Sequence, residues 1–232
     1  MSGLAFPGAV LFDVDGTLVD TPAGMAVVLR TVVEEHGRVV DEDRLRRTIG
    51  RPLTASFGTL LDLPADDPEV ARAADRARQL FTELVIPSAG ELVFPGIPAL
   101  LAELREHGRP LAVVTSKVRR SAVELLEAAG LLAAFDTLSC HDMVEFGKPH
   151  PDLALLAADA LGVPPDRCAV VGDAIDDVLM ARAAGMDCLG VTTGVASAAE
   201  LVAAGAREVL ADVPALREII LRIPAPFGSH QG

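Results

Sequence analysis

Residues 9–17 read AVLFDVDGT, and this stretch decides the fold. Its apolar first half fits a strand that is buried on both faces. The strand ends in two acids, Asp13 and Asp15, and residues two apart in an extended chain point to the same side. Gly16 then allows a sharp turn and a close approach of backbone to a ligand. Two like charges at a buried strand end need a cation or a proton to offset them, so the stretch indicates a divalent metal, acid–base chemistry, or both.

The same stretch has two other interpretations. Acids and glycine are ordinary turn residues, so residues 13–16 alone also fit a strand followed by a turn. They also match the first half of an EF-hand loop, but Gly24 stands where the loop's twelfth position needs a glutamate. The stretch therefore predicts an active site only if partners come from elsewhere in the chain.

The composition restricts the partners. The 232 residues carry 20 Lys and Arg against 33 Asp and Glu, a formal net charge of −13, so we expect no binding to nucleic acids or anionic membranes. There is no membrane-length apolar run and no signal-peptide pattern, which indicates a cytoplasmic protein. Three widely spaced cysteines argue against a disulfide framework and a zinc site. Monomer and dimer both remain open.

The rest of the chain divides into two kinds of pattern. Residues 18–89 show helix-period apolar residues without a strand pattern, and helices are expected at 22–36, 41–49, 53–61 and 68–85. From residue 90 helices and apolar strands alternate. Strands are expected at 111–116, 135–139, 168–173, 187–192 and 208–210, and the last helix from residue 213.

This alternation predicts an α/β fold. We expect a Rossmann-like parallel sheet built from residues 1–17 and 90–232, with an all-helical domain, residues 18–89, inserted between them. Ligands of such sheets bind beyond the carboxyl ends of the strands. Three predicted strands end there in polar residues, with the Asp13 strand expected in the centre, between the strands of Thr115 and Asp173.

Four segments in this order resemble the four motifs of the haloacid dehalogenase superfamily. They are Asp13–Thr17, Val113–Ser116, Lys148-Pro149 and Gly172–Asp177. The resemblance spans nearly the whole chain, and the helical insert after the first motif is similar to the family's helical-cap subclass. It implies a phosphatase with an aspartyl-phosphate intermediate.

The resemblance also implies roles for the catalytic residues. Asp13 would attack phosphorus, and Asp15 would protonate the leaving oxygen and then take a proton from the hydrolytic water. The Thr115 hydroxyl would hold phosphoryl oxygens, and Lys148 would offset their charge. Lysine is usually solvated, but this chain has only two, so we favour a site role for Lys148.

Magnesium is the cofactor that the resemblance implies. The Asp13 carboxylate, the Asp15 backbone carbonyl and the Asp173 carboxylate would bind Mg²⁺, and Asp177 would complete the metal site behind them. Few protein ligands and several waters suit this ion.

Five further residues are candidates for substrate binding: Gly16, Thr17, Arg51, Ser116 and Lys117. Arg51 lies in the cap stretch Gly50–Leu53, where the glycine allows close approach. Arg51 and Lys117 have an equally open interpretation as solvent-exposed side chains.

The substrate is expected to be a small phosphorylated metabolite, and the choice among these is left open. Residues 50–56, together with residues 115–118 and 147–152, resemble actinobacterial phosphatases of pseudouridine 5′-phosphate, which favours a nucleotide or sugar phosphate. Phosphoglycolate phosphatases and inorganic pyrophosphatases share the layout, and so does a different class, the sugar phosphomutases. Asp15 argues against the dehalogenases, which lack an acid there.

Overall fold

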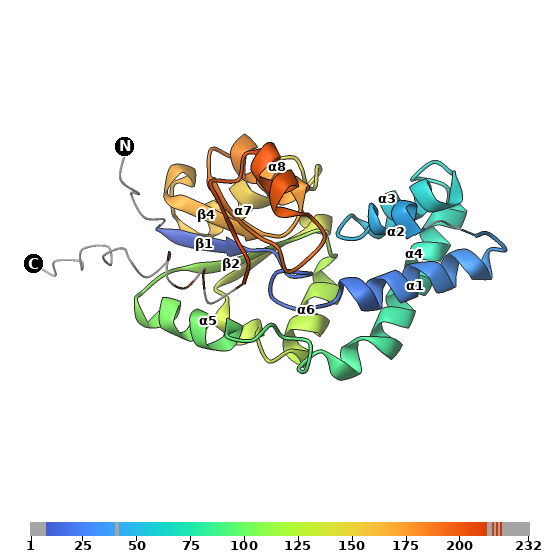
Figure 1. The fold of residues 1–232 in the computed structure, drawn as a ribbon, viewed down its shortest axis with the longest axis horizontal. Coiled ribbons are helices and arrows are strands. Elements are labelled where there is room, and N and C mark those ends of the chain that lie inside the picture. The colour runs from blue at the N-terminus through green and yellow to red at the C-terminus, as the bar shows by residue number, and fades with distance from the viewer. Residues whose placement is uncertain (1–7, 40–41, 213–214, 216, 218, 220–232) are drawn as a thin grey trace, which may run out of the picture.

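The structure is a computed structural model that describes residues 8–39, 42–212, 215, 217 and 219. This part of the chain forms a six-stranded parallel sheet in the order β3-β2-β1-β4-β5-β6 (Figure 1). The strands are β1 (Ala9–Phe12), β2 (Leu111–Thr115), β3 (Thr137–Cys140), β4 (Cys168–Gly172), β5 (Asp187–Val191) and β6 (Glu208–Leu210). The α/β prediction is confirmed, and β1 lies centrally between β2 and β4 as expected.

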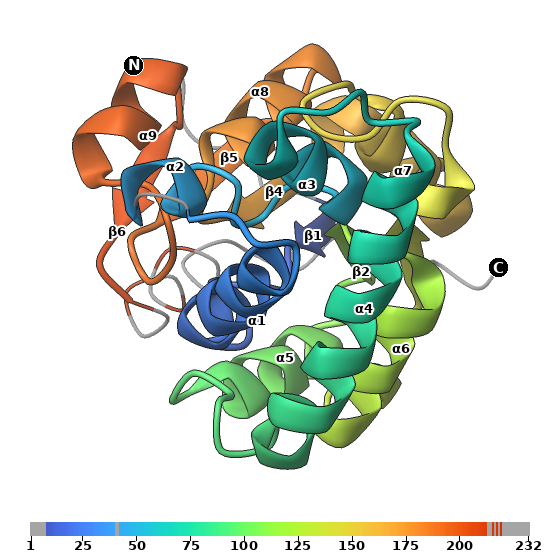
Figure 2. The ribbon, with the colours of Figure 1, turned by 90° about the vertical axis from the view of Figure 1, so that its right-hand side faces the viewer.

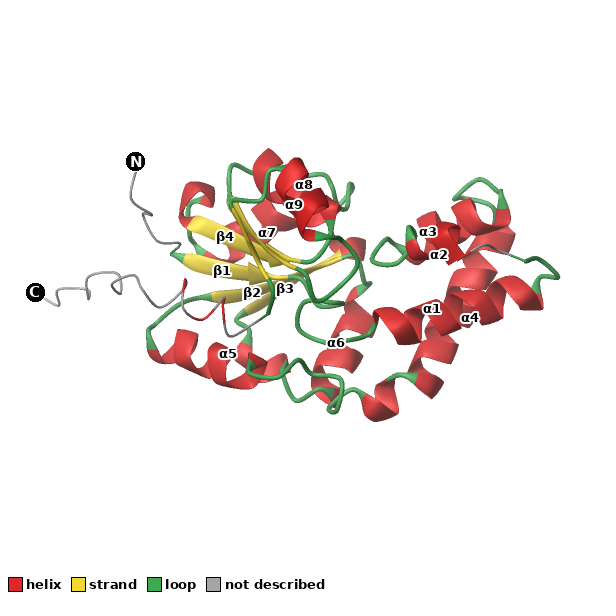
Figure 3. Ribbon diagram, in the orientation of Figure 1, coloured by secondary structure: helices red, strands yellow, loops and turns green. Residues whose placement is uncertain are grey.

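β1 is buried on both faces because its alternate side chains enter two hydrophobic cores. Val10 and Phe12 belong to one core, and Ala9 and Leu11 belong to the other. Helices cover both faces of the sheet (Figure 3). The first core includes residues of α5 (Ile97–Glu106) and α6 (Arg119–Ala128), and the second includes residues of α7 (Asp152–Leu161), α8 (Ile175–Ala183) and α9 (Ala198–Ala204).

The segment between β1 and α5 is helical throughout its described residues, apart from turns and isolated bridges. We call residues 22–88 the helical insert, and it lies beyond the carboxyl ends of the strands (Figure 1). It contains α1 (Pro22–Glu35), α2 (Glu42–Arg46), α3 (Leu53–Leu61), α4 (Pro68–Leu84) and the short 3₁₀ helix η1 (Ile86–Ser88). Further 3₁₀ helices in the rest of the chain are η2 (Leu132–Ala134), η3 (His141–Met143) and η4 (Pro165–Arg167).

α4 is the longest helix of the insert, and its start follows from local sequence. The Asp67 carboxylate accepts a hydrogen bond from the Glu69 N–H at 2.7 Å, and Pro68 occupies the first turn. The buried face carries Ala73, Ala74, Ala77, Leu80 and Phe81. The three small alanines let α1 and α3 pack closely against α4.

Two elements differ from the sequence expectation. The helix expected at 41–49 ends at Arg46, because the N–H groups of Thr48 and Ile49 bond to carbonyls three residues back. β3 begins at residue 137 rather than 135. Phe135 instead packs edge-on against Phe12, with ring centroids 6.2 Å apart. Most of the helix expected from residue 213 lies outside the described residues.

Candidate active site

Three of the four predicted motifs meet at the carboxyl edge of the sheet because the strands that carry them are parallel neighbours. Asp13 follows β1, and its N–H donates to the Val171 carbonyl of β4 at 2.9 Å. Thr115 ends β2 on one side of β1, and Asp173 follows β4 on the other. This edge faces the helical insert (Figure 1). The predicted convergence of these residues is therefore present.

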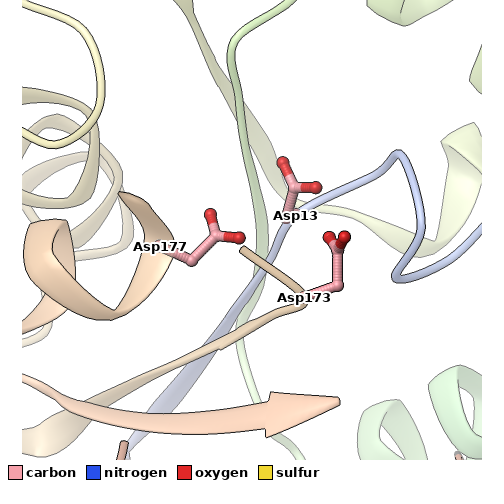
Figure 4. Close-up of side chains that lie close together, drawn as sticks. All are labelled: Asp13, Asp173 and Asp177. Atoms are coloured by element: carbon pink, nitrogen blue, oxygen red, sulfur yellow. The ribbon is translucent and has the colours of Figure 1, made fainter. Parts of the chain in front are cut away.

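Asp13, Asp173 and Asp177 form a buried acid cluster (Figure 4). One carboxylate oxygen from each lies within 4.8 Å of the others, and none of the three residues is more than 7% exposed. Burial raises the pKa of Asp13 well above its ordinary value, against the charge of Lys148. Burial and the neighbouring Asp177 raise the pKa of Asp173 to about 7. The site therefore favours a proton or a cation, and a set of carboxylate oxygens fits Mg²⁺.

Lys148, the third motif, inserts its ammonium group into this cluster. Its Nζ lies 2.5 Å from Asp13 Oδ1 and 2.6 Å from Asp177 Oδ1, and its side chain is 5% exposed. Burial lowers the pKa of Lys148, but the two carboxylates outweigh burial and hold it above its ordinary value. Asp177 is itself held by the Ala174 N–H, which donates to Oδ2 at 3.1 Å. Lys148 is therefore a fixed positive charge beside Asp13.

Asp173 is oriented by groups on two separate loops. The Thr17 hydroxyl donates to Oδ1 at 3.1 Å, and the Val195 N–H donates to Oδ2 at 2.8 Å. A Cβ on Gly16 would lie 2.6 Å from Asp173 Oδ2, and a Cβ on Gly194 would lie 1.9 Å from it. Gly16 also has a positive φ of 77°. Thr17, a substrate-binding candidate, thus hydrogen-bonds an acid of the cluster.

The loop after β5 was missed by the sequence reasoning. The Thr193 hydroxyl donates to the Gly16 carbonyl at 2.6 Å, so residues 193–195 hold both the first and the fourth motif. A signal for this role exists in the sequence. Two threonines and a glycine directly follow the apolar strand 187–191, as polar residues follow the other strands that reach the site.

Asp15 points away from the acid cluster, toward the helical insert. The Thr21 hydroxyl, at the start of α1, donates to Asp15 Oδ1. Lys117 Nζ lies 3.2 Å from the same oxygen, and its side chain is 10% exposed. Lys117 is thus largely buried beside Asp15 rather than solvated, and its part in the site stays a prediction. The two acids of the first motif are separated into different surroundings.

Thr115 and Ser116 carry the second motif. Thr115 is 1% exposed, and its hydroxyl oxygen accepts from the Lys117 N–H at 3.2 Å, which leaves its own proton free to donate. Ser116 lies in the wall of a cavity that also contacts Asp15.

Two hollows meet at the predicted cap stretch. A cleft of about 720 Å³ contacts Asp13, Lys148 and the acid cluster. A narrower cavity of about 260 Å³ lies between the helical insert and the sheet domain. Asp15 and Arg51 line both, and Arg51 is exposed, with no ion pair among the described residues. Arg51 therefore stands where the two spaces join.

Comparison with known proteins identifies the family. The profile described as haloacid dehalogenase-like hydrolase matches residues 10–191. The chain belongs to the haloacid dehalogenase-like hydrolase family. "Probable phosphatase IndB" of Dickeya dadantii is 46% identical over 196 residues, which cover 84% of this chain and 85% of that protein. The N-acetylmuramic acid 6-phosphate phosphatase of Pseudomonas aeruginosa is 33% identical over 91% of this chain and 92% of its own. Among solved structures, a hydrolase from Pseudomonas syringae matches with a TM-score of 0.82 and 28% identity, covering 93% of this chain and 99% of that chain.

The superfamily resemblance of the four motifs is thereby confirmed. Within the haloacid dehalogenase-like hydrolases, the phosphatases among its relatives place this chain with the phosphoric monoester hydrolases. The roles of the individual residues stay predictions. Eight of the eleven site residues line the two hollows or form the acid cluster, while Thr17 hydrogen-bonds Asp173 and Thr115 accepts from the Lys117 N–H. The remaining residue, Gly16, supports Asp173. No helix in the described part of the chain combines the length and apolarity needed to cross a membrane.

Proposed function

We propose that the protein is a Mg²⁺-dependent phosphatase that hydrolyses a small phosphate monoester through an aspartyl-phosphate on Asp13. The observation that carries the proposal is the surroundings of Asp13. This carboxylate lies 2.5 Å from the Lys148 ammonium and in one cluster with Asp173 and Asp177, while Asp15 stands apart on the side of the insert. A nucleophile, its charge partner and a separate acid–base group are the parts that phosphoryl transfer needs.

The acid cluster fits the proposed metal ion. The Asp13 and Asp173 carboxylates and the Asp15 carbonyl would hold Mg²⁺, and Asp177 would keep Lys148 and the metal site in place. The bound ion would supply positive charge to the transferring phosphoryl group. The raised pKa values of Asp13 and Asp173 support this assignment, because these carboxyls ionise fully only when a cation compensates them.

The side chains of the site would perform two steps. In the first, Asp13 Oδ attacks phosphorus, the P–O bond to the leaving group breaks, and Asp15 gives its proton to the departing oxygen. In the second, Asp15 takes a proton from a water that attacks the aspartyl-phosphate, and phosphate leaves. Lys148 and the Thr115 hydroxyl hold the phosphoryl oxygens in both steps.

The leaving group would occupy the cavity of about 260 Å³, because this cavity is lined by Asp15, the proposed proton donor to the leaving oxygen. Two-carbon glycolate is a small group, so it would leave most of this cavity to solvent. The cavity combines an apolar wall (Met25, Leu29, Leu53 and Phe81) with hydroxyl groups and Arg78. These features favour a nucleoside or sugar, such as that of pseudouridine 5′-phosphate, over phosphoglycolate.

Residues 18–89 would act as the cap that covers the bound ester and excludes water. The enzyme would work in the cytoplasm on a small phosphorylated metabolite. The free state of all three cysteines, Cys140, Cys168 and Cys188, agrees with a reducing compartment.

Three measurements test the proposal. Asp13→Asn should abolish turnover with an unchanged circular dichroism spectrum, because an amide cannot serve as the nucleophile. EDTA should remove activity and Mg²⁺ should restore it; full activity in metal-free buffer would contradict the metal assignment. A screen of phosphate esters should rank pseudouridine 5′-phosphate or a related nucleotide above phosphoglycolate. Interconversion of glucose 1-phosphate and glucose 6-phosphate without phosphate release would assign the protein to the phosphomutases instead.

A further inference from the structure

Lys117 connects the helical insert to the proposed acid–base residue. Its backbone belongs to the sheet domain, since its N–H donates to Thr115 Oγ1 at 3.2 Å and its carbonyl accepts from the His141 N–H at 2.9 Å. Its ammonium group instead lies 4.1 Å from the ring centroid of Phe81, in α4 of the insert. The same Nζ is 3.2 Å from Asp15 Oδ1. One cation therefore contacts an aromatic ring of the insert and the carboxylate of Asp15.

The burial of these groups makes the contacts specific. The side chains of Lys117 and Asp15 are 10% and 17% exposed and Phe81 is 5% exposed, so little water reaches the ammonium group. A cation over a ring is held more strongly when both are withdrawn from solvent. α4 lies beside α6 at this junction (Figure 2), where the Thr82 hydroxyl also donates to Glu124 at 3.2 Å.

We propose that Lys117 is a positioning residue, which fixes the Asp15 carboxylate only when Phe81 of the helical insert is docked against it. On this proposal Lys117 does not bind the phosphoryl group. Lys148 already neutralises Asp13, and the Lys117 ammonium is engaged with Asp15 on the insert side. The position of Asp15 then depends on the position of the insert, so proton transfer to the leaving group is efficient only under a docked cap. The inference rests on the proposed function, because it assigns Asp15 the role of proton donor.

Leaving-group dependence separates positioning from phosphate binding. Phenyl phosphate and p-nitrophenyl phosphate share a ring and a phosphoryl group, but phenolate is the poorer leaving group and needs the proton more. The quantity kcat/KM reports the reaction up to its first transition state, so the later action of Asp15 on water does not enter it. A positioned general acid contributes about 10²- to 10⁴-fold, and misplacing it removes part of that factor.

The experiment measures kcat/KM for both esters in the wild type and in the variants Lys117→Met, Lys117→Arg and Phe81→Leu. Lys117→Met should lower kcat/KM for phenyl phosphate about tenfold or more, and for p-nitrophenyl phosphate less than about threefold. Phe81→Leu should give a smaller loss with the same preference, and the double variant should lose no more than Lys117→Met alone. Lys117→Arg should recover most of the phenyl phosphate activity, because the guanidinium is also a cation that stacks on rings.

Phe57→Leu is the matched control. Phe57 is a buried phenylalanine of α3 in the same insert and lines neither hollow. It should lower stability while leaving the ratio of the two esters unchanged. A change in this ratio equal to that of Phe81→Leu would attribute the effect to general loosening of the insert and would overturn the proposal.

Other outcomes also decide the question. Equal losses on both esters in Lys117→Met would assign Lys117 to the phosphoryl group and refute positioning. Additive losses in the double variant would refute coupling through Phe81. The contact between Lys117 and Phe81 can also be tested without an activity assay, by a double-mutant cycle on the free energy of unfolding. Strictly additive losses of stability in the double variant would likewise refute the coupling. Absence of hydrolysis of either ester by the wild type would instead count against the proposed function.

Discussion

Lys148 Nζ lies 2.5 Å from Asp13 Oδ1 and shares its charge with Asp177 at 2.6 Å. Lys148 and Asp13 are separated by 135 positions in the chain, and the lysine side chain is nearly inaccessible. The Lys148 ammonium group compensates the buried Asp13 carboxylate and thereby reduces the net negative charge of the acid cluster. The predictions below depend on this balance of charge around Asp13.

Removing the ammonium group should disable the site without unfolding the protein. Lys148→Met keeps the apolar stem but leaves Asp13 and Asp177 without their cation. We expect kcat to fall by about 10²-fold or more, because a preorganised charge partner of the phosphoryl group is lost. Lys148→Arg should not restore activity, since the larger guanidinium does not fit a position that is 5% exposed. Steady-state kinetics and the melting temperature check both statements, and recovery by arginine would contradict them.

The stability of the metal-free protein should fall as pH rises through a defined window. The pKa of Asp173 is raised to about 7 in the fold, whereas an unfolded aspartate titrates near about 4. Between these values the folded state holds more protons than the unfolded state, so the free energy of unfolding decreases with pH and levels off above the window. Chemical denaturation in EDTA from pH 5 to 8 measures this.

Two additions make this pH test specific. Asp173→Asn removes the titrating group and should flatten the pH dependence. Mg²⁺ at neutral pH should raise the melting temperature of the wild type, because an ion that binds only the folded state stabilises it. Stability that rises with pH in EDTA would contradict the charge balance described here.

Gly194 should be required for metal affinity. A Cβ at this position would lie 1.9 Å from Asp173 Oδ2, so Gly194→Ala must displace that carboxylate. We expect the Mg²⁺ concentration for half-maximal activity to rise about 10- to 100-fold, as when the support of a metal ligand is lost. Gly90→Ala is the control, since its Cβ would meet only a carbonyl at 3.7 Å. An unchanged Mg²⁺ requirement in Gly194→Ala would remove Asp173 from the metal site.

Arg51 should act on the leaving group. Bound phosphate already has Lys148, whereas Arg51 lines the cavity that begins at Asp15. Arg51→Ala should lower kcat/KM for the natural substrate by about one to two decades, equivalent to about 1.5–3 kcal/mol for a charge-assisted hydrogen bond. It should barely change kcat/KM for p-nitrophenyl phosphate, because the leaving group of this ester makes few contacts with the cap. Arg72→Ala, an exposed arginine of α4 that lines neither hollow, is the control. Equal losses on both esters would assign Arg51 to the phosphate or to closure.

The sheet, the helical insert and the acids at the strand ends can be predicted from the sequence alone. These features depend on short-range rules: apolar runs form buried strands, helix-period residues form helices, and a parallel sheet brings strand ends to one edge. The sequence therefore predicts that Asp13, Thr115 and Asp173 lie together. The errors at 47–49 and 135–136 fall at element ends, where packing of single side chains such as Phe135 decides the boundary.

The contacts of the individual side chains, in contrast, depend on tertiary packing. It places the Thr17 hydroxyl on Asp173, residues 193–195 behind the acid cluster, and Lys117 between Asp15 and Phe81. Each contact joins segments far apart in the chain, so it depends on how the insert and the loops pack against the sheet. The local sequence around Lys117 does not predict this packing, because a lysine ammonium group is equally stable when it is solvated at the surface.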